Sequence, residues 1–146
     1  MSSFSHSPHC VATDDNRRVT IRIVQLGTPR APGEGPRLGT VRRPPRGVRK
    51  TDYAKRDFFD VWLPNLSPSQ PLVSAALASD SASAWNAFAR RFRAEMKKPE
   101  ASHLLDTLAL LSHSADFSVG CYCDDESRCH RSLLRELLVA RGARVA

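Results

Sequence analysis

The C-terminal part of the sequence, where a short apolar run is followed by an amphipathic one, restricts the fold most. Residues 117–123 read Phe-Ser-Val-Gly-Cys-Tyr-Cys, which is typical of a short buried strand. An acidic loop follows, and residues 129–141 then predict a helix that stops at Gly142. The apolar stripe of this helix consists of Leu133, Leu134, Leu137 and Leu138. A strand, a tight loop and a helix in this order belong to a βαβ-type layer, so we expect an α/β fold.

The rest of the chain supplies further strands and helices. Residues 19–26 alternate β-branched and polar side chains, which predicts a strand. Residues 30–46 contain four prolines and three glycines, so we expect a loop there, with an extended piece at 38–41. We expect a short helix at 72–77 and a basic amphipathic helix capped by Ser83. The apolar face of the basic helix consists of Trp85, Phe88, Phe92 and Met96.

Length and composition are those of one globular domain. The chain has 146 residues, of which 41% are hydrophobic and 25% charged. We expect a flexible N-terminal tail over residues 1–16 and a single domain over residues 17–146. His6, His9 and Cys10 fall in this tail, where we expect mobile surface side chains and no metal site. Without an apolar run of about 18 residues or a signal-peptide pattern, we expect a cytoplasmic protein that does not enter a membrane.

A cationic excess points to anionic partners. Lys and Arg exceed Asp and Glu by 22 to 15, which gives a formal net charge of +7. This balance favours nucleotides, phosphorylated small molecules or nucleic acids, although it also serves solubility. Five cations lie within residues 42–50, where two prolines stiffen the backbone, and an anion-binding rim is one interpretation of this loop. Its candidate ligand-binding residues are Arg42, Arg43 and Arg46.

The residues best suited to chemistry gather between positions 121 and 132. They lie where a predicted strand ends and a helix begins, which is where open α/β sheets bind ligands. The free N–H groups at the helix start favour an anion, and they lower the pKa of a cysteine placed there. We therefore expect Cys121, Cys129 and His130 as catalytic candidates. The ligand-binding candidates of this segment are Arg128, Arg131 and Ser132.

Two other functions remain open for the same sequence. The cysteines and His130 would also suit a metal, haem or thiol-redox module. The spacing argues against structural zinc, whose ligand pairs are usually separated by two to four residues, so we expect no metal and no cofactor. The second alternative is nucleic-acid binding through the basic helix. Neither a glycine-rich phosphate loop nor a phosphatase-type thiol loop is found.

Three segments resemble the signatures of an uncharacterised bacterial family, domain of unknown function 488. Residues 120–134 contain its strand-end Cys and its Cys-His-Arg-Ser helix start, and residues 39–48 and 60–69 resemble its Arg-rich turn and Trp-Leu stretch. The resemblance covers about residues 21–142. It implies a compact three-layer domain with a Rossmann-like central sheet flanked by helices, and it implies no established reaction. The site residues that this resemblance implies are Arg42, Arg43, Arg46, Cys121, Cys129, His130, Arg131 and Ser132. Cys123 and Tyr122 depart from many relatives.

Overall fold

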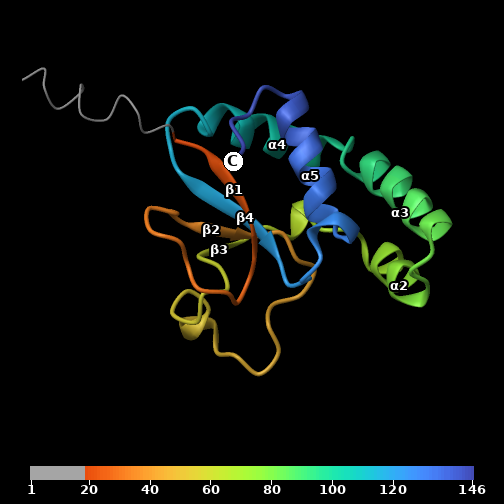
Figure 1. Cartoon of the computed structure of the whole chain (residues 1–146), viewed down its shortest axis with the longest axis horizontal. Coiled ribbons are helices and arrows are strands. Elements are labelled where there is room, and N and C mark those ends of the chain that lie inside the picture. The colour runs from red at the N-terminus through yellow and green to blue at the C-terminus, as the bar shows by residue number, and fades with distance from the viewer. Residues whose placement is uncertain (1–18) are drawn as a thin grey trace, which may run out of the picture.

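A computed structural model describes residues 19–146 and shows a compact α/β fold (Figure 1). The expected tail over residues 1–16, with His6, His9 and Cys10, lies outside the described residues. Four parallel strands form one sheet in the order β1-β4-β2-β3. The strands are β1 (Ile21–Gln25), β2 (Arg37–Gly39), β3 (Val61–Trp62) and β4 (Phe117–Cys121). The α/β prediction is therefore confirmed.

Residues 19–146 contain four α-helices. They are α2 (Gln70–Ala78), α3 (Ala82–Glu95), α4 (Pro99–Leu111) and α5 (His130–Ala140). The cap of α3 was predicted at Ser83, whereas the structure places it at Ser81, whose hydroxyl accepts a hydrogen bond of 3.1 Å from the N–H of Ala84. The described part of the chain also has three short 3₁₀ turns: η1 (Lys50–Asp52), η2 (Pro64–Leu66) and η3 (Glu126–Arg128).

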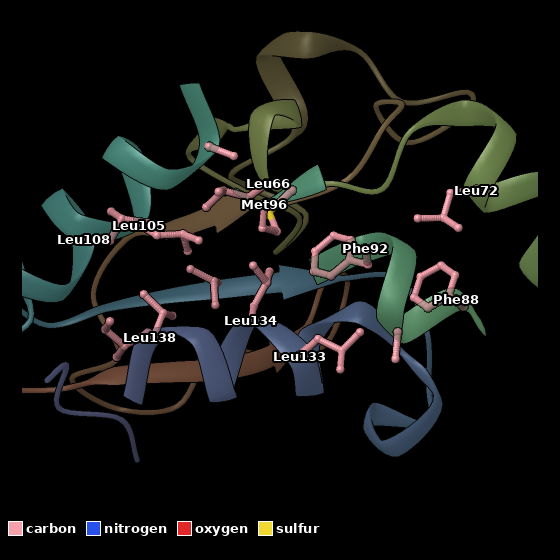
Figure 2. Close-up of a cluster of buried hydrophobic side chains, with 14 of the residues drawn as sticks. Leu66, Leu72, Phe88, Phe92, Met96, Leu105, Leu108, Leu133, Leu134 and Leu138 are labelled. Atoms are coloured by element: carbon pink, nitrogen blue, oxygen red, sulfur yellow. The ribbon is translucent and has the colours of Figure 1, made fainter. Parts of the chain in front are cut away.

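The main core lies between the helices and one face of the sheet. Phe92 of α3, Leu105 of α4 and Leu134 of α5 are fully buried and meet there, as Figure 2 shows. Ile21 and Val119 supply the sheet side of this core. Burying such side chains stabilises the fold by about 1.5–3 kcal/mol each, because their apolar surface leaves water.

The opposite face of the sheet is covered by irregular chain. A Cβ atom at Gly39 of β2 would lie 2.3 Å from the Phe59 ring, so only glycine lets that ring sit against the strand. Phe59 belongs to a second, smaller core with Leu26, Val41, Cys121 and Cys129. A loop with a 3₁₀ turn therefore forms the third layer, where helices on both faces were expected. The reason is local: Asp57, between η1 and Phe59, has a φ of 63° in the left-handed region, so the chain turns there and does not continue as a helix.

The C-terminus closes the edge of the sheet. Val145 forms an isolated parallel bridge with Ile21 of β1, so the end of the described chain lies along the outer strand. Within residues 19–146, no helix combines the length and apolar character required to cross a bilayer.

Candidate functional site

The candidate site lies where β4 ends and α5 begins. Cys121 is the last residue of β4, and Cys129 is the N-cap of α5. The loop between them is held by η3 and by Asp125, which accepts a hydrogen bond of 3.0 Å from the N–H of Ser127. This short closed loop brings the start of the helix back to the end of its own strand.

Three thiols converge at this junction. The sulfur atoms of Cys121, Cys123 and Cys129 all lie within 4.8 Å of one another, and the Cys121 and Cys123 sulfurs are 3.8 Å apart. Cys121 and Cys129 are buried, whereas Cys123 is exposed. Strand alternation accounts for the shared face of Cys121 and Cys123, and the return of the chain through η3 adds the third sulfur.

The surroundings shift the pKa values of the three thiols in different directions. Hydrogen bonds from Cys121 and Cys123 lower the pKa of the Cys129 thiol, and the neighbouring His130 acts in the same direction against the effect of burial. Hydrogen bonds with Cys123 and Cys129, together with burial, raise the pKa of Cys121. Of the three thiols, Cys129 is therefore the one whose deprotonation its surroundings favour most, and its place at the start of a helix acts in the same direction.

His130 is held in one orientation by the neighbouring strand segment. Its Nε2 lies 2.7 Å from the carbonyl oxygen of Thr40 and 3.2 Å from the Thr40 hydroxyl. Because a carbonyl oxygen only accepts, Nε2 carries a proton and donates it to Thr40. Nδ1 lies 3.7 Å from the Cys129 sulfur, so the ring and the thiol face each other.

Arg131 and Ser132 point into the protein. Arg131 is only 3% exposed and donates a hydrogen bond of 2.6 Å to the carbonyl oxygen of Cys123. The Ser132 hydroxyl donates to the carbonyl oxygen of Cys129, which fastens the first turn of α5. Both side chains support the loop that carries the thiols.

A cavity of about 750 Å³ opens beside the thiol cluster. It follows the carboxyl ends of β2 and β4, and α2 and the loop after β2 form its walls. The lining residues with chemical groups of interest are Arg42, Arg43, Arg46, Arg128, Cys121, Cys123, Tyr122 and His130. The cavity thus brings three candidates of the proline-rich loop, Arg42, Arg43 and Arg46, beside three of the β4–α5 junction, Cys121, Arg128 and His130. The other three candidates, Cys129, Arg131 and Ser132, do not line it.

The arginine loop is fastened to the rest of the site. The Tyr122 hydroxyl donates a hydrogen bond of 2.9 Å to the carbonyl oxygen of Arg43. Arg42 donates to the carbonyl oxygens of Pro68 and Ser67, at 3.0 and 3.2 Å. Arg43 and Arg46 are exposed, and within residues 19–146 their guanidinium groups form no hydrogen bond or ion pair. These two cations are therefore available to a ligand.

Comparison with known proteins supports the kinship read from the sequence. A family model described as the active DUF488-N3 subclade matches residues 21–142. The chain belongs to the domain of unknown function 488 family. No curated protein and no solved structure matches the chain. The DUF488 match includes both the arginine loop and the β4–α5 junction, so both halves of the candidate site lie inside the family domain.

Several site residues in this DUF488 chain were not found by sequence reasoning. Thr40, which orients His130, is 90 positions away from it and was not among the candidates, although it lies in the segment that resembles the Arg-rich turn. Phe88 and α2 were also missed as walls of a site, because their apolar residues are typical of an ordinary core. The Cys-x-Cys pattern of Cys121 and Cys123 was the one local signal, since alternate strand residues share a face.

Proposed function

We propose that the protein binds an anionic small molecule of the phosphate or nucleotide type in the cavity beside the thiol cluster. The observation that carries this proposal is the charge of the cavity lining. Four arginines line it, and none of its lining residues within the described chain is an aspartate or a glutamate. Guanidinium groups bind phosphate and carboxylate in a fork geometry, so this lining favours an anion over a cation.

The size and walls of the cavity favour a ligand with an apolar part as well. A volume of about 750 Å³ lies within the range of sites for cofactor-sized ligands. Phe58, Phe88 and Tyr122 line it together with prolines and aliphatic residues. A planar ring could pack on these walls while its phosphate groups reach Arg43 and Arg46, which suits a nucleotide better than free phosphate.

The thiols and His130 give the cavity a reactive wall. Cys121, Cys123 and His130 line the cavity, so a bound ligand would lie beside them. The description of the matched subclade as active agrees with a site that does more than bind. The catalytic roles of Cys121, Cys129 and His130 stay predictions, which single-turnover assays on a bound ligand would test.

Isothermal titration against a panel of nucleotides and phosphorylated metabolites tests the proposal. We expect binding by the wild type, and we expect Arg46→Ala to weaken it by roughly 10- to 100-fold, since a hydrogen bond to a charged group contributes about 1.5–3 kcal/mol. Arg49→Ala is the matched control, because Arg49 lies in the same loop, is also exposed, and does not line the cavity.

Two results would contradict the proposal. One is no binding at millimolar ligand. The other is an equal loss of affinity in Arg46→Ala and Arg49→Ala, which would indicate attraction by the general positive charge. Binding of a DNA or RNA oligonucleotide that weakens steeply with salt would instead favour the nucleic-acid alternative. The exposed Arg90, Arg91 and Lys97 of the α3 region would then be the surface to examine.

A further inference from the structure

The arrangement of the three sulfur atoms carries an inference of its own. We infer that Cys121, Cys123 and Cys129 form a binding site for one thiophilic metal ion of the Zn²⁺ type. The cysteines left a metal module open as an alternative, but their spacing along the chain argued against a zinc site. The structure nevertheless brings three sulfur ligands from a strand, a loop and a helix start within 4.8 Å of one another.

The distances agree with tetrahedral coordination. A Zn²⁺ ion binds thiolates at about 2.3 Å, and tetrahedral angles then separate two sulfur ligands by about 3.8 Å. The Cys121 and Cys123 sulfurs are 3.8 Å apart, and every pair in the cluster lies within 4.8 Å. Only small side-chain rotations are needed to bring all three sulfurs to the ligand distance.

The surroundings compensate the charge of such a centre. Three thiolates around a divalent cation leave one net negative charge. Arg131 lies beside the cluster, 3% exposed and bonded to the carbonyl oxygen of Cys123, and within the described residues it forms no ion pair with a carboxylate. Its buried Nε has no hydrogen-bond partner. A buried guanidinium is costly without a counter-charge, and the thiolate centre would supply one.

The three sulfurs leave one coordination position open. Zinc sites with three protein ligands and an open fourth position are typical of catalysis, whereas structural sites use four protein ligands. Cys121 and Cys123 both line the cavity, so an exchangeable ligand would approach from there. His130, fixed by Thr40 and 3.7 Å from the Cys129 sulfur, orients that thiolate from outside the cluster.

This inference does not depend on the proposed anion site, because it needs none of the cavity arginines. The two ideas can therefore fail separately. Arg46→Ala should weaken the nucleotide ligand and leave metal affinity unchanged, and Cys123→Ser should have its main effect on the metal.

Titration of the reduced, metal-free full-length chain with Co²⁺ and then Zn²⁺ tests the inference. We expect one Co²⁺ per chain, with an intense thiolate-to-cobalt charge-transfer band and the visible bands of a tetrahedral ion, and we expect Zn²⁺ to displace it. Loss of a residue that only hydrogen-bonds a metal ligand lowers metal affinity by roughly 10- to 100-fold. Each cysteine would bind the metal directly, so we expect a larger loss of metal affinity in Cys121→Ser, Cys123→Ser and Cys129→Ser. Cys10→Ser is the matched control and should leave binding unchanged.

Cys123→Ser is the decisive variant, because Cys123 is exposed and its replacement should not disturb folding. Far-ultraviolet circular dichroism of each variant checks this. Absence of the charge-transfer band in the reduced wild type would overturn the inference, as would equal weakening by Cys10→Ser. Rapid formation of a disulfide within the cluster, in a protein that binds no metal when reduced, would overturn it in favour of a thiol-redox module.

Discussion

Two buried arginines in this protein have opposite surroundings. Arg37, at the start of β2, is 1% exposed and bonds both carboxylate oxygens of the buried Glu34, at 2.5 and 3.2 Å. It also donates to the carbonyl oxygens of Thr28 and Asp57, at 2.7 Å each. Arg131, in the first turn of α5, is 3% exposed, donates to one carbonyl oxygen and has a buried Nε without a partner.

This difference indicates that Arg37 has a structural role, whereas Arg131 keeps a charge and a hydrogen-bond donor for a functional partner. Every group around Arg37 is already present in the chain, and together they fasten the loops that cover the second face of the sheet. Around Arg131 the chain supplies three thiols and no carboxylate partner within the described residues. Strain or incomplete compensation of this kind is more common at functional sites than in the rest of a fold.

Removing Arg37 should have the largest effect on stability. Arg37→Met strands a buried carboxylate and leaves several carbonyl oxygens without a donor, so we expect the free energy of unfolding to fall by about 3–5 kcal/mol. Urea unfolding followed by circular dichroism measures this loss. Arg93→Ala is the control, because its pair with Glu136 is exposed and should contribute no more than about 1 kcal/mol. Equal losses in the two variants would contradict the structural role of Arg37.

Removing Arg131 should lower stability less than removing Arg37 does, and it should also weaken metal binding. Arg131→Met loses a charged hydrogen bond without stranding a carboxylate, so we expect a loss of about 1.5–3 kcal/mol. The same variant should weaken Co²⁺ binding by roughly 10- to 100-fold, as expected for a residue that interacts with the metal ligands but does not bind the metal itself. Unchanged metal affinity would show that Arg131 only supports the loop. Both arginines would then be structural, and they would differ only in how much stability each contributes.

Acid should weaken the Arg37 region by the smallest amount. Burial raises the pKa of Glu34, but the hydrogen bonds from Arg37 and from the N–H of Ala31, together with the charge of Arg37, outweigh burial in sum, so the net pKa lies below its ordinary value of 4.5. Glu34 therefore stabilises the fold fully above the ordinary pKa, and this contribution is lost as the pH falls through the lowered one. Urea unfolding at pH values from about 7 to 3 should show the difference between wild type and Glu34→Gln shrinking at the acid end. A constant difference would show that the charge of Glu34 is not involved.

Local sequence patterns were sufficient for most of the elements. The strand expected at residues 19–26 is β1, and the helix expected at 129–141 is α5, with Cys129 as its N-cap. Phe59 is buried in the second core, whereas Trp62, three residues later, is 42% exposed. Trp62 lies on β3 at the edge of the sheet, and its indole N–H donates to the carbonyl oxygen of Val41. Hydrophobicity alone does not tell an edge strand from a central one.

The candidate site could be predicted only in part. The sequence placed Cys121 at a strand end and Cys129 at a helix start, because strand alternation and helix caps are local properties. It did not predict that Arg131 turns inward, nor that Thr40 reaches His130 across the sheet. Such contacts depend on the order of the strands, which local periodicity does not contain.

The sequence by itself thus determined the α/β class, most of the strands and helices, and the position of the cysteine-rich junction, since each follows from spacing along a few neighbouring residues. The tertiary structure alone decided which side chains meet. The parallel pairing of β2 with β4 brings the arginine loop beside the end of β4, and the return of the chain through η3 closes three thiols to within 4.8 Å. Both results come from long-range packing, where the burial of apolar surface on the sheet fixes distances that no local pattern specifies.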